Sequence, residues 1–194
     1  MALSLAEIKQ AVADYVGTTD RVTTALINEA QRRTALYTPR QTMEQVDVDA
    51  DGRFTLPATC LILKGMSWQG RELYPYPDRL PPEIPEGTPR WYLQLDQVIQ
   101  LLPKQEGVVD ILFTPRPRPL ENAEDTLGLA DADNVVIAIA IQLWFEGEAD
   151  YEEEALWWKG VADERLAEWA ALERQRHFRP TVVNIDVLTK YFGA

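Results

Sequence analysis

The longest apolar pattern of the chain lies between residues 131 and 172 and has two halves. The first half, residues 134–145, contains only two polar side chains, Asn134 and Gln142. Its isoleucines alternate with alanines, which is also a strand pattern, but the run is longer than the roughly 4–8 residues of most strands. We therefore predict a helix that is buried on all sides, with a strand as the alternative.

The second half has apolar side chains on one face of a helix only. We expect Asp150 to be its N-cap, with Glu153 at the capping-box position and Glu152–Glu154 in its first turn. Gly147 is expected to end the preceding helix in the left-handed conformation. The two halves thus predict a helical hairpin. Spaced three or four residues apart, the apolar positions are Ala155, Trp158, Ala162, Leu166, Trp169 and Leu172.

Two shorter helices are predicted before residue 40. Ser4 and Glu7 form a capping box for a helix over residues 5–16, which Gly17 ends. Pro39 stops the second helix, which reaches about Tyr37. The expected buried positions are Ile8, Val12 and Tyr15 in the first helix; the second, capped by Thr19 or Asp20, buries Val22, Leu26, Ala30 and either Arg33 or Tyr37.

Residues 41–115 follow a different pattern, in which short apolar or alternating runs are separated by turn residues. This pattern predicts antiparallel strands. The predicted hairpins join 44–48 to 53–56 through Asp51-Gly52, 60–68 to 72–74 through Gln69-Gly70, and 91–95 to 98–102 through Asp96-Gln97. Residues 108–114 form the closing strand. A proline-rich loop over 75–89 and an extended connector through Pro115, Pro117 and Pro119 complete this region.

Together these elements predict an α+β protein. Residues 1–40 and 120–178 are expected to form a four-helix-type bundle, and residues 41–119 an inserted antiparallel β domain. Residues 179–194 are expected to be an extended tail that docks on a partner, because it is too apolar for a solvated tail. Its docking residues are Val182, Val183, Ile185, Val187, Leu188, Tyr191 and Phe192. The alternative is a tail that packs on its own bundle.

The formal charge of −12 is concentrated in one region. Residues 121–168 hold 14 acidic and 2 basic side chains. Nucleic-acid binding needs lysine and arginine at the phosphates, so specific binding of DNA is not expected. The acidic region is either a solvated surface or a surface that repels DNA passing close by. No run of 18 apolar residues predicts a membrane span.

Candidate chemistry is sparse. Asp47, Asp49 and Asp51 match the start of a calcium loop, but Ala58 stands where the bidentate glutamate is needed, so we expect no calcium site. His177 is the only histidine and belongs to a basic turn. Cys60 is the only cysteine and is expected to be buried, which fits a reducing host cytoplasm. We therefore expect no catalytic residues, metal or cofactor.

The order of the elements and motifs resembles a known family. Two helices are followed by Phe54-Thr-Leu-Pro57, then Gly87-Thr-Pro89-Arg-Trp-Tyr92 and Val98-Ile-Gln-Leu-Leu-Pro103. A strand ending in Pro115-Arg-Pro117 and two helices rich in alanine and aromatics come next. Over about residues 3–175 this order is similar to the head–tail connector (adaptor) proteins of tailed phages, in particular the tail tubular protein A type of short-tailed phages.

The resemblance implies a structural virion protein at the head–tail junction, made in the host cytoplasm. It implies a ring, usually of twelve copies, that joins the portal to a downstream tail or nozzle protein and lets DNA pass. The alternatives are a small phage-encoded hydrolase of the tail or lysis apparatus that uses a carboxylate pair, and a monomeric chaperone or binding module.

Overall fold

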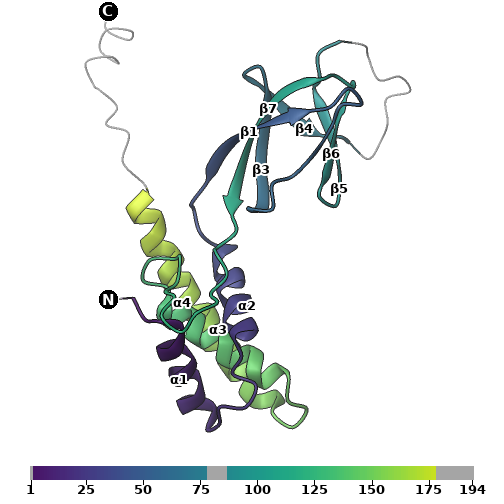
Figure 1. Cartoon of the computed structure of the whole chain (residues 1–194). Coiled ribbons are helices and arrows are strands. Elements are labelled where there is room, and N and C mark those ends of the chain that lie inside the picture. The colour runs from purple at the N-terminus through teal and green to yellow at the C-terminus, as the bar shows by residue number, and fades with distance from the viewer. Residues whose placement is uncertain (1, 78–86, 178–194) are drawn as a thin grey trace, which may run out of the picture.

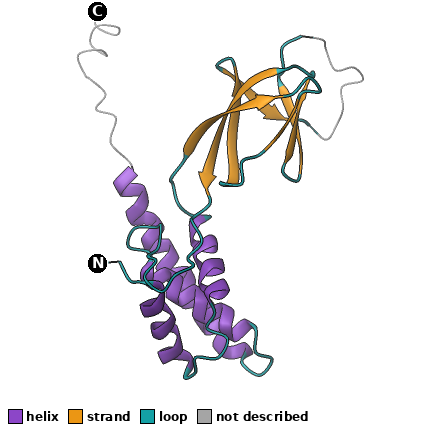
Figure 2. Cartoon of the chain, in the orientation of Figure 1, coloured by secondary structure: helices purple, strands orange, loops and turns teal. Residues whose placement is uncertain are grey.

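Helices gather at one end of this computed structural model and strands at the other (Figures 1 and 2). The structure describes residues 2–77 and 87–177. The α+β class predicted from the sequence is confirmed. In this part of the chain the elements are α1 (Leu5–Val16), α2 (Thr24–Ala35), β1 (Thr42–Val48), β2 (Arg53–Thr55), β3 (Cys60–Trp68), β4 (Arg71–Pro75), β5 (Trp91–Leu95), β6 (Val98–Leu102), β7 (Gly107–Pro115), α3 (Asp133–Glu146) and α4 (Glu152–His177).

The first helix has the bounds and caps that the sequence predicts. The Ser4 side chain accepts a hydrogen bond from the Glu7 N–H, and the Glu7 side chain accepts one from the Ser4 N–H. Gly17 ends α1 in the left-handed conformation, with φ of 74°. Ile8 and Val12 are buried as expected, but the prediction for Tyr15 is wrong, because its ring lies 60% exposed in the last turn.

The second helix starts later than predicted. Arg21 adopts a left-handed backbone, with φ of 63°, which interrupts any helix begun at Thr19 or Asp20. Thr23 is the N-cap instead, and its side chain accepts a hydrogen bond from the Leu26 N–H. Val22 and Ala30 are buried as predicted, and Leu26 is partly buried against the helical core. The last predicted position is wrong for both of its alternatives, because Arg33 is only partly buried and Tyr37 is 58% exposed. The buried residues of α2 itself are Ile27, Ala30, Gln31, Thr34 and Ala35.

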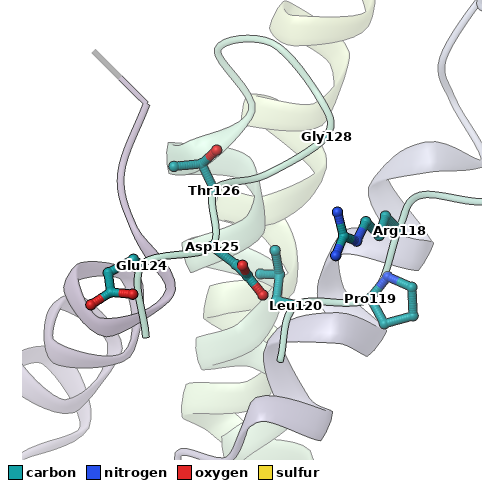
Figure 3. A pocket seen from close by; sticks show the side chains of 7 residues that line it. All are labelled: Arg118, Pro119, Leu120, Glu124, Asp125, Thr126 and Gly128. Carbon is teal, nitrogen blue, oxygen red and sulfur yellow. The ribbon is translucent and has the colours of Figure 1, made fainter. Parts of the chain in front are cut away.

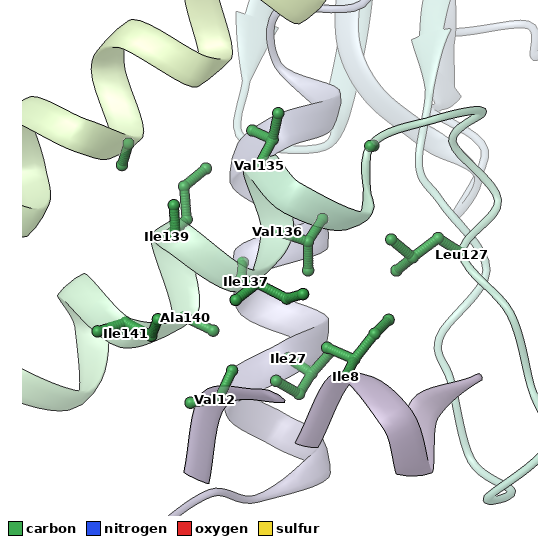
Figure 4. Close-up of a cluster of buried hydrophobic side chains, with 14 of the residues drawn as sticks. Ile8, Val12, Ile27, Leu127, Val135, Val136, Ile137, Ile139, Ala140 and Ile141 are labelled. Carbon is green, nitrogen blue, oxygen red and sulfur yellow. The ribbon is translucent and has the colours of Figure 1, made fainter. Parts of the chain in front are cut away.

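Helix α3 is the centre of the helical part, because α1, α2 and α4 each contact it. Its buried side chains surround the helix, from Val135 through Gln142, so the helix prediction holds and the strand alternative does not. In Figure 4, Ile137 of α3 lies close to Ile8, Val12 and Ile27 from the two N-terminal helices. Leu127, from the segment before α3, closes another side of the same core.

The α3–α4 hairpin differs from its prediction at the turn. Gly147 keeps a right-handed backbone, with φ of −81°, and its N–H donates to the Trp144 carbonyl at 3.1 Å, a tightened last turn that needs no left-handed residue. Helix α4 begins at Glu152 rather than after an Asp150 cap, because the first helical bond runs from the Ala155 N–H to the Tyr151 carbonyl.

Most of the predicted apolar stripe of α4 is buried. Trp158, Ala162, Leu166 and Trp169 pack into the helical core, and Ala155 is partly buried against it; Leu172 is 53% exposed, so that prediction is wrong. The Trp169 indole N–H donates a hydrogen bond to the carbonyl of Ala130, at 2.9 Å. Ala130 precedes the first residue of α3, which is Asp133. Near Leu172, α4 therefore extends beyond the end of α3, and among the described residues no helix packs against it there.

The seven strands form one sheet in the order β1-β7-β3-β4-β5-β6-β2, curled into a nearly closed, barrel-like shape (Figure 1). The two hairpins predicted at Gln69-Gly70 and Asp96-Gln97 are confirmed as β3–β4 and β5–β6. Gln69, Gly70 and Asp96 have positive φ, as tight hairpin turns require.

The first predicted hairpin is wrong. A local turn forms at Asp51-Gly52, where the Asp49 N–H donates to the Arg53 carbonyl at 2.9 Å. Beyond it the strands separate: β1 pairs with β7, and β2 pairs with β6. A second correction concerns strand direction, because β4 and β5 are parallel rather than antiparallel. Residues 78–86 of the predicted proline-rich loop lie outside the described residues.

The helical part and the sheet have separate hydrophobic cores. The sheet core holds Trp68, Ile99, Ile111 and Phe113, none of which belongs to the helical core. Two segments, residues 36–41 and 116–119, connect the parts (Figure 1). Gln31 fixes the second segment to α2, because its buried side chain donates to the Arg118 carbonyl, at 2.9 Å, and accepts from the Gly128 N–H, at 3.3 Å.

Candidate interaction surfaces

Large apolar side chains are exposed where α1 and the α3–α4 turn lie. We call Tyr15, Tyr151, Leu156 and Trp157 the aromatic tip; their exposed fractions are 60%, 42%, 69% and 63%. The buried Trp158 joins two of them, with its ring edge-on to Tyr15 at 5.3 Å and to Trp157 at 4.9 Å. Tyr151 packs on Phe145, at 5.6 Å between ring centroids, and Leu156 lines a pocket together with Phe145. Several exposed apolar side chains at this end of the helical part indicate a contact surface for another protein better than scattered single residues do.

The apolar period of α4 does not reveal the aromatic tip. The periodic stripe of α4 selects the positions that face α3, and Trp157 lies next to that stripe in sequence but turned about 100° away from it on the helix. The adjacent residues Trp157 and Trp158 do indicate an exposed tryptophan, because a helix that packs against one neighbour cannot fully bury two consecutive side chains. The structure shows that Trp158 is the buried one.

The acidic side chains of α4 form an exposed surface. Glu152, Glu153 and Glu154 in the first turn, and Asp163, Glu164 and Glu168 further along, are all exposed. Within residues 2–77 and 87–177, the ion pairs found between side chains use other acids, namely Glu29, Asp131, Glu146, Glu148 and Glu173. In the described chain these six carboxylates of α4 are therefore not neutralised by ion pairs, and the outer side of α4 carries a negative charge.

A pocket of about 310 Å³ lies between the connector and the segment before α3 (Figure 3). Its carboxylate, Asp125, accepts hydrogen bonds from the N–H groups of Asn122 and Glu121, at 2.8 and 2.7 Å, and these bonds lower the Asp125 pKa. Glu124 points away from Asp125 and Arg118. The Asp125 carboxylate is thus used to fix the backbone at residues 121–122. The pocket presents no pair of carboxylates that face each other for acid–base chemistry.

Three aspartates resemble the start of a calcium loop. Asp47 lies in β1, and Asp49 and Asp51 lie in the turn between β1 and β2. One Asp49 carboxylate oxygen accepts a hydrogen bond from the Arg53 N–H at 2.8 Å, so this side chain is used to shape the turn. The described residues contain no group of three or more histidine, cysteine, aspartate or glutamate side chains that is arranged to hold a metal ion. Ala58 offers no ligand at the position of the missing glutamate.

Two further residues singled out by the sequence can be placed. Cys60 begins β3 and is buried, and burial raises the pKa of its thiol, which disfavours the reactive thiolate. His177 is the last residue of α4. The predicted docking residues of the tail, all within 182–192, lie outside the described residues.

The comparison with protein families decides the class of protein. The model of a family described as SU10 adaptor protein matches residues 3–184. The chain belongs to this family. The resemblance to phage adaptor proteins inferred from the sequence is therefore confirmed. A search of curated proteins finds no match.

Family membership gives the adaptor a structural role in the phage particle, in contact with other virion proteins, rather than the role of an enzyme. This assignment agrees with exposed aromatic side chains on α4 and with a pocket whose carboxylate serves the backbone. None of the described helices combines the length and the apolar character that crossing a bilayer requires.

Proposed function

We propose that this adaptor forms a ring between the portal of the phage head and the tail, and that DNA passes through the ring. The match of an adaptor family over residues 3–184 carries the proposal. The proposed ring contains twelve copies, and its second partner is a downstream tail or nozzle protein. DNA is not bound specifically, and no cofactor takes part.

The proposed ring assigns different tasks to three parts of the chain. Residues 1–40 and 120–178 act together as a four-helix-type bundle and build the ring body. Residues 41–119 act as a β domain directed at the tail, and residues 179–194 dock on another virion protein. The separate hydrophobic cores of helices and sheet support the first two assignments, since each part can keep its own packing when partners bind.

The aromatic tip supports a contact with a second protein in the particle. Tryptophan and tyrosine dominate the energetics of protein–protein interfaces, because they bury a large area and lose little side-chain entropy. Trp157 and Leu156 are more than 60% exposed in the isolated chain. Burying these side chains against a partner in the assembled particle would remove apolar surface from water and so stabilise the contact.

The acidic surface of α4 supports a place next to the DNA. Phosphates are held by lysine and arginine, so a wall of carboxylates lets DNA slide without sticking. Glu153, Glu164 and Glu168 are exposed carboxylates on the outer side of α4 and are proposed to line the channel. Replacing Glu164 and Glu168 with lysine should slow DNA release from particles, whereas replacing them with glutamine should change the rate much less.

The proposal is tested by mixing the purified adaptor with the portal protein of the phage that encodes it and imaging the product by electron microscopy. We expect rings of twelve adaptors attached to the portal. The double variant Leu156→Ser/Trp157→Ser should form fewer rings, and Leu172→Ser, which alters an exposed leucine outside the aromatic tip, serves as the control. Absence of any complex at micromolar concentrations of both proteins would refute the ring.

A further inference from the structure

The outer edge of β1 has no strand beside it in the described chain. Strand β1 stands at one end of the sheet and pairs only with β7. The strand at the other end, β2, approaches it only at the turn around Asp49. Thr42 through Gln45 are exposed, and Met43 is 69% exposed. In an antiparallel pair every second residue directs its N–H and C=O away from the partner, so half of β1 offers these groups outward.

This edge lacks most of the features that normally protect an edge strand. Proteins normally block an edge strand with proline, charged side chains (especially lysine) or a bulge, or make the strand very short, since free backbone groups recruit other strands. Strand β1 has seven residues without a proline or a lysine, its only charged side chains are Glu44 and Asp47, and its pairing with β7 is regular throughout. By contrast, β2 at the other end has only three residues. The long edge is thus the one left able to accept a strand.

A segment of the same sequence fits this edge. Residues 181–187 read Thr-Val-Val-Asn-Ile-Asp-Val, seven residues of which five are β-branched. Val183, Ile185 and Val187 alternate with Asn184 and Asp186, the pattern of a strand with one face buried. The segment has the length of β1, and Pro180 separates it from α4, which ends at His177. Strand β1 has the same alternation, because Val46 and Val48 face the sheet core. A strand added beside β1 could therefore place Val183, Ile185 and Val187 on the same face of the sheet.

We propose that residues 181–187 of a neighbouring copy add a strand to the outer edge of β1. This inference rests on the proposed ring, in which each copy makes the same contact with the next. Donor segment and acceptor edge are different surfaces, so the contact is heterologous and repeats from copy to copy until the ring closes. Main-chain hydrogen bonds supply the affinity, and the alternating valine and isoleucine side chains fix which face turns inward.

The first test is a cross-linking experiment on rings assembled with the portal. Chains carrying Gln45→Cys are mixed with chains carrying Asn184→Cys or Asp186→Cys, and the rings are oxidised. Each chain has only one new cysteine, and Cys60 is buried, so a disulfide between the new cysteines must join two copies. We expect a band of two chains on a non-reducing gel. A matched control with Leu95→Cys, exposed at the end of β5, should give none.

Hydrogen exchange provides the second test. In assembled rings, amides of residues 42–48 should exchange at least tenfold more slowly in the full chain than after deletion of residues 181–194, while residues 98–102 should not change. The double variant Val183→Pro/Ile185→Pro, which keeps the tail but removes two N–H groups, should match the deletion. Rings that form without the cross-link, or with unchanged exchange at β1, would overturn this inference and leave the ring standing. Failure to form any ring would overturn both.

Discussion

Trp158→Ala gives the sharpest test of how the helical core is built. Trp158 is only 8% exposed and belongs to the core formed by α1, α2 and α3. A buried tryptophan removes roughly 150–250 Å² from water, or roughly 4–6 kcal/mol at about 25 cal/mol per Å². Alanine keeps a part of this area, and the edge-on contacts with Tyr15 and Trp157 are lost. We therefore expect a loss of about 3–5 kcal/mol in the free energy of unfolding.

The neighbouring residue supplies a matched control. Trp157→Ala removes the same side chain from the same helix, but from a position that is 63% exposed, so its expected cost is about 1 kcal/mol or less. Both variants are measured by urea unfolding followed by far-UV circular dichroism, with the slope compared to check that the transition is unchanged. Equal costs for the two variants, or a loss under about 1 kcal/mol for Trp158→Ala, would refute the reasoning.

Three further predictions concern the sheet. Gly107→Ala should lower the free energy of unfolding by at least about 2 kcal/mol, because a Cβ there would meet the Trp68 ring at 2.6 Å on a backbone with φ of 155°. Gly128→Ala is the control, since a Cβ there meets nothing within 4 Å, and it should cost less in the same urea unfolding experiment. Calorimetric titration with calcium should give no heat of specific binding, and a micromolar site that disappears in Asp49→Ala would contradict this. The Cys60 thiol, whose pKa is raised by burial, should react with a thiol reagent at pH 8 only as fast as the protein opens; reaction at the rate of a free thiol would show that it is accessible.

Local signals determined those elements whose stabilising contacts are close in sequence. The capping box of Ser4 and Glu7 and the left-handed Gly17 fix both ends of α1 within a few residues of each end. The Gln69-Gly70 and Asp96-Gln97 turns close their hairpins because the turn backbone alone sets the register of the two strands. Helix α3 could be predicted from composition, since a helix with apolar side chains all round must be buried on all sides.

The candidate interaction surfaces were less predictable than the elements. The sequence indicated an acidic region and an apolar tail, because charge and apolar content can be counted along the chain. It did not reveal the aromatic tip or the open edge of β1. Which of Trp157 and Trp158 stays exposed depends on where α1 and α3 lie, and whether a strand edge is free depends on which strands occupy the other edges.

Tertiary structure alone decided the choices between locally equal alternatives. The Asp51-Gly52 turn forms as its sequence predicts, yet β1 pairs with β7 and β2 with β6, partners that lie far along the chain and come close only in the folded sheet. Leu172 continues the apolar period of α4 but lies beyond the part of α4 that α3 covers, whereas the neighbouring Glu173 is buried and forms an ion pair with Arg176. The sequence by itself determined which segments are helices and strands and which strands form the two tight hairpins; only long-range packing determined how the other elements meet.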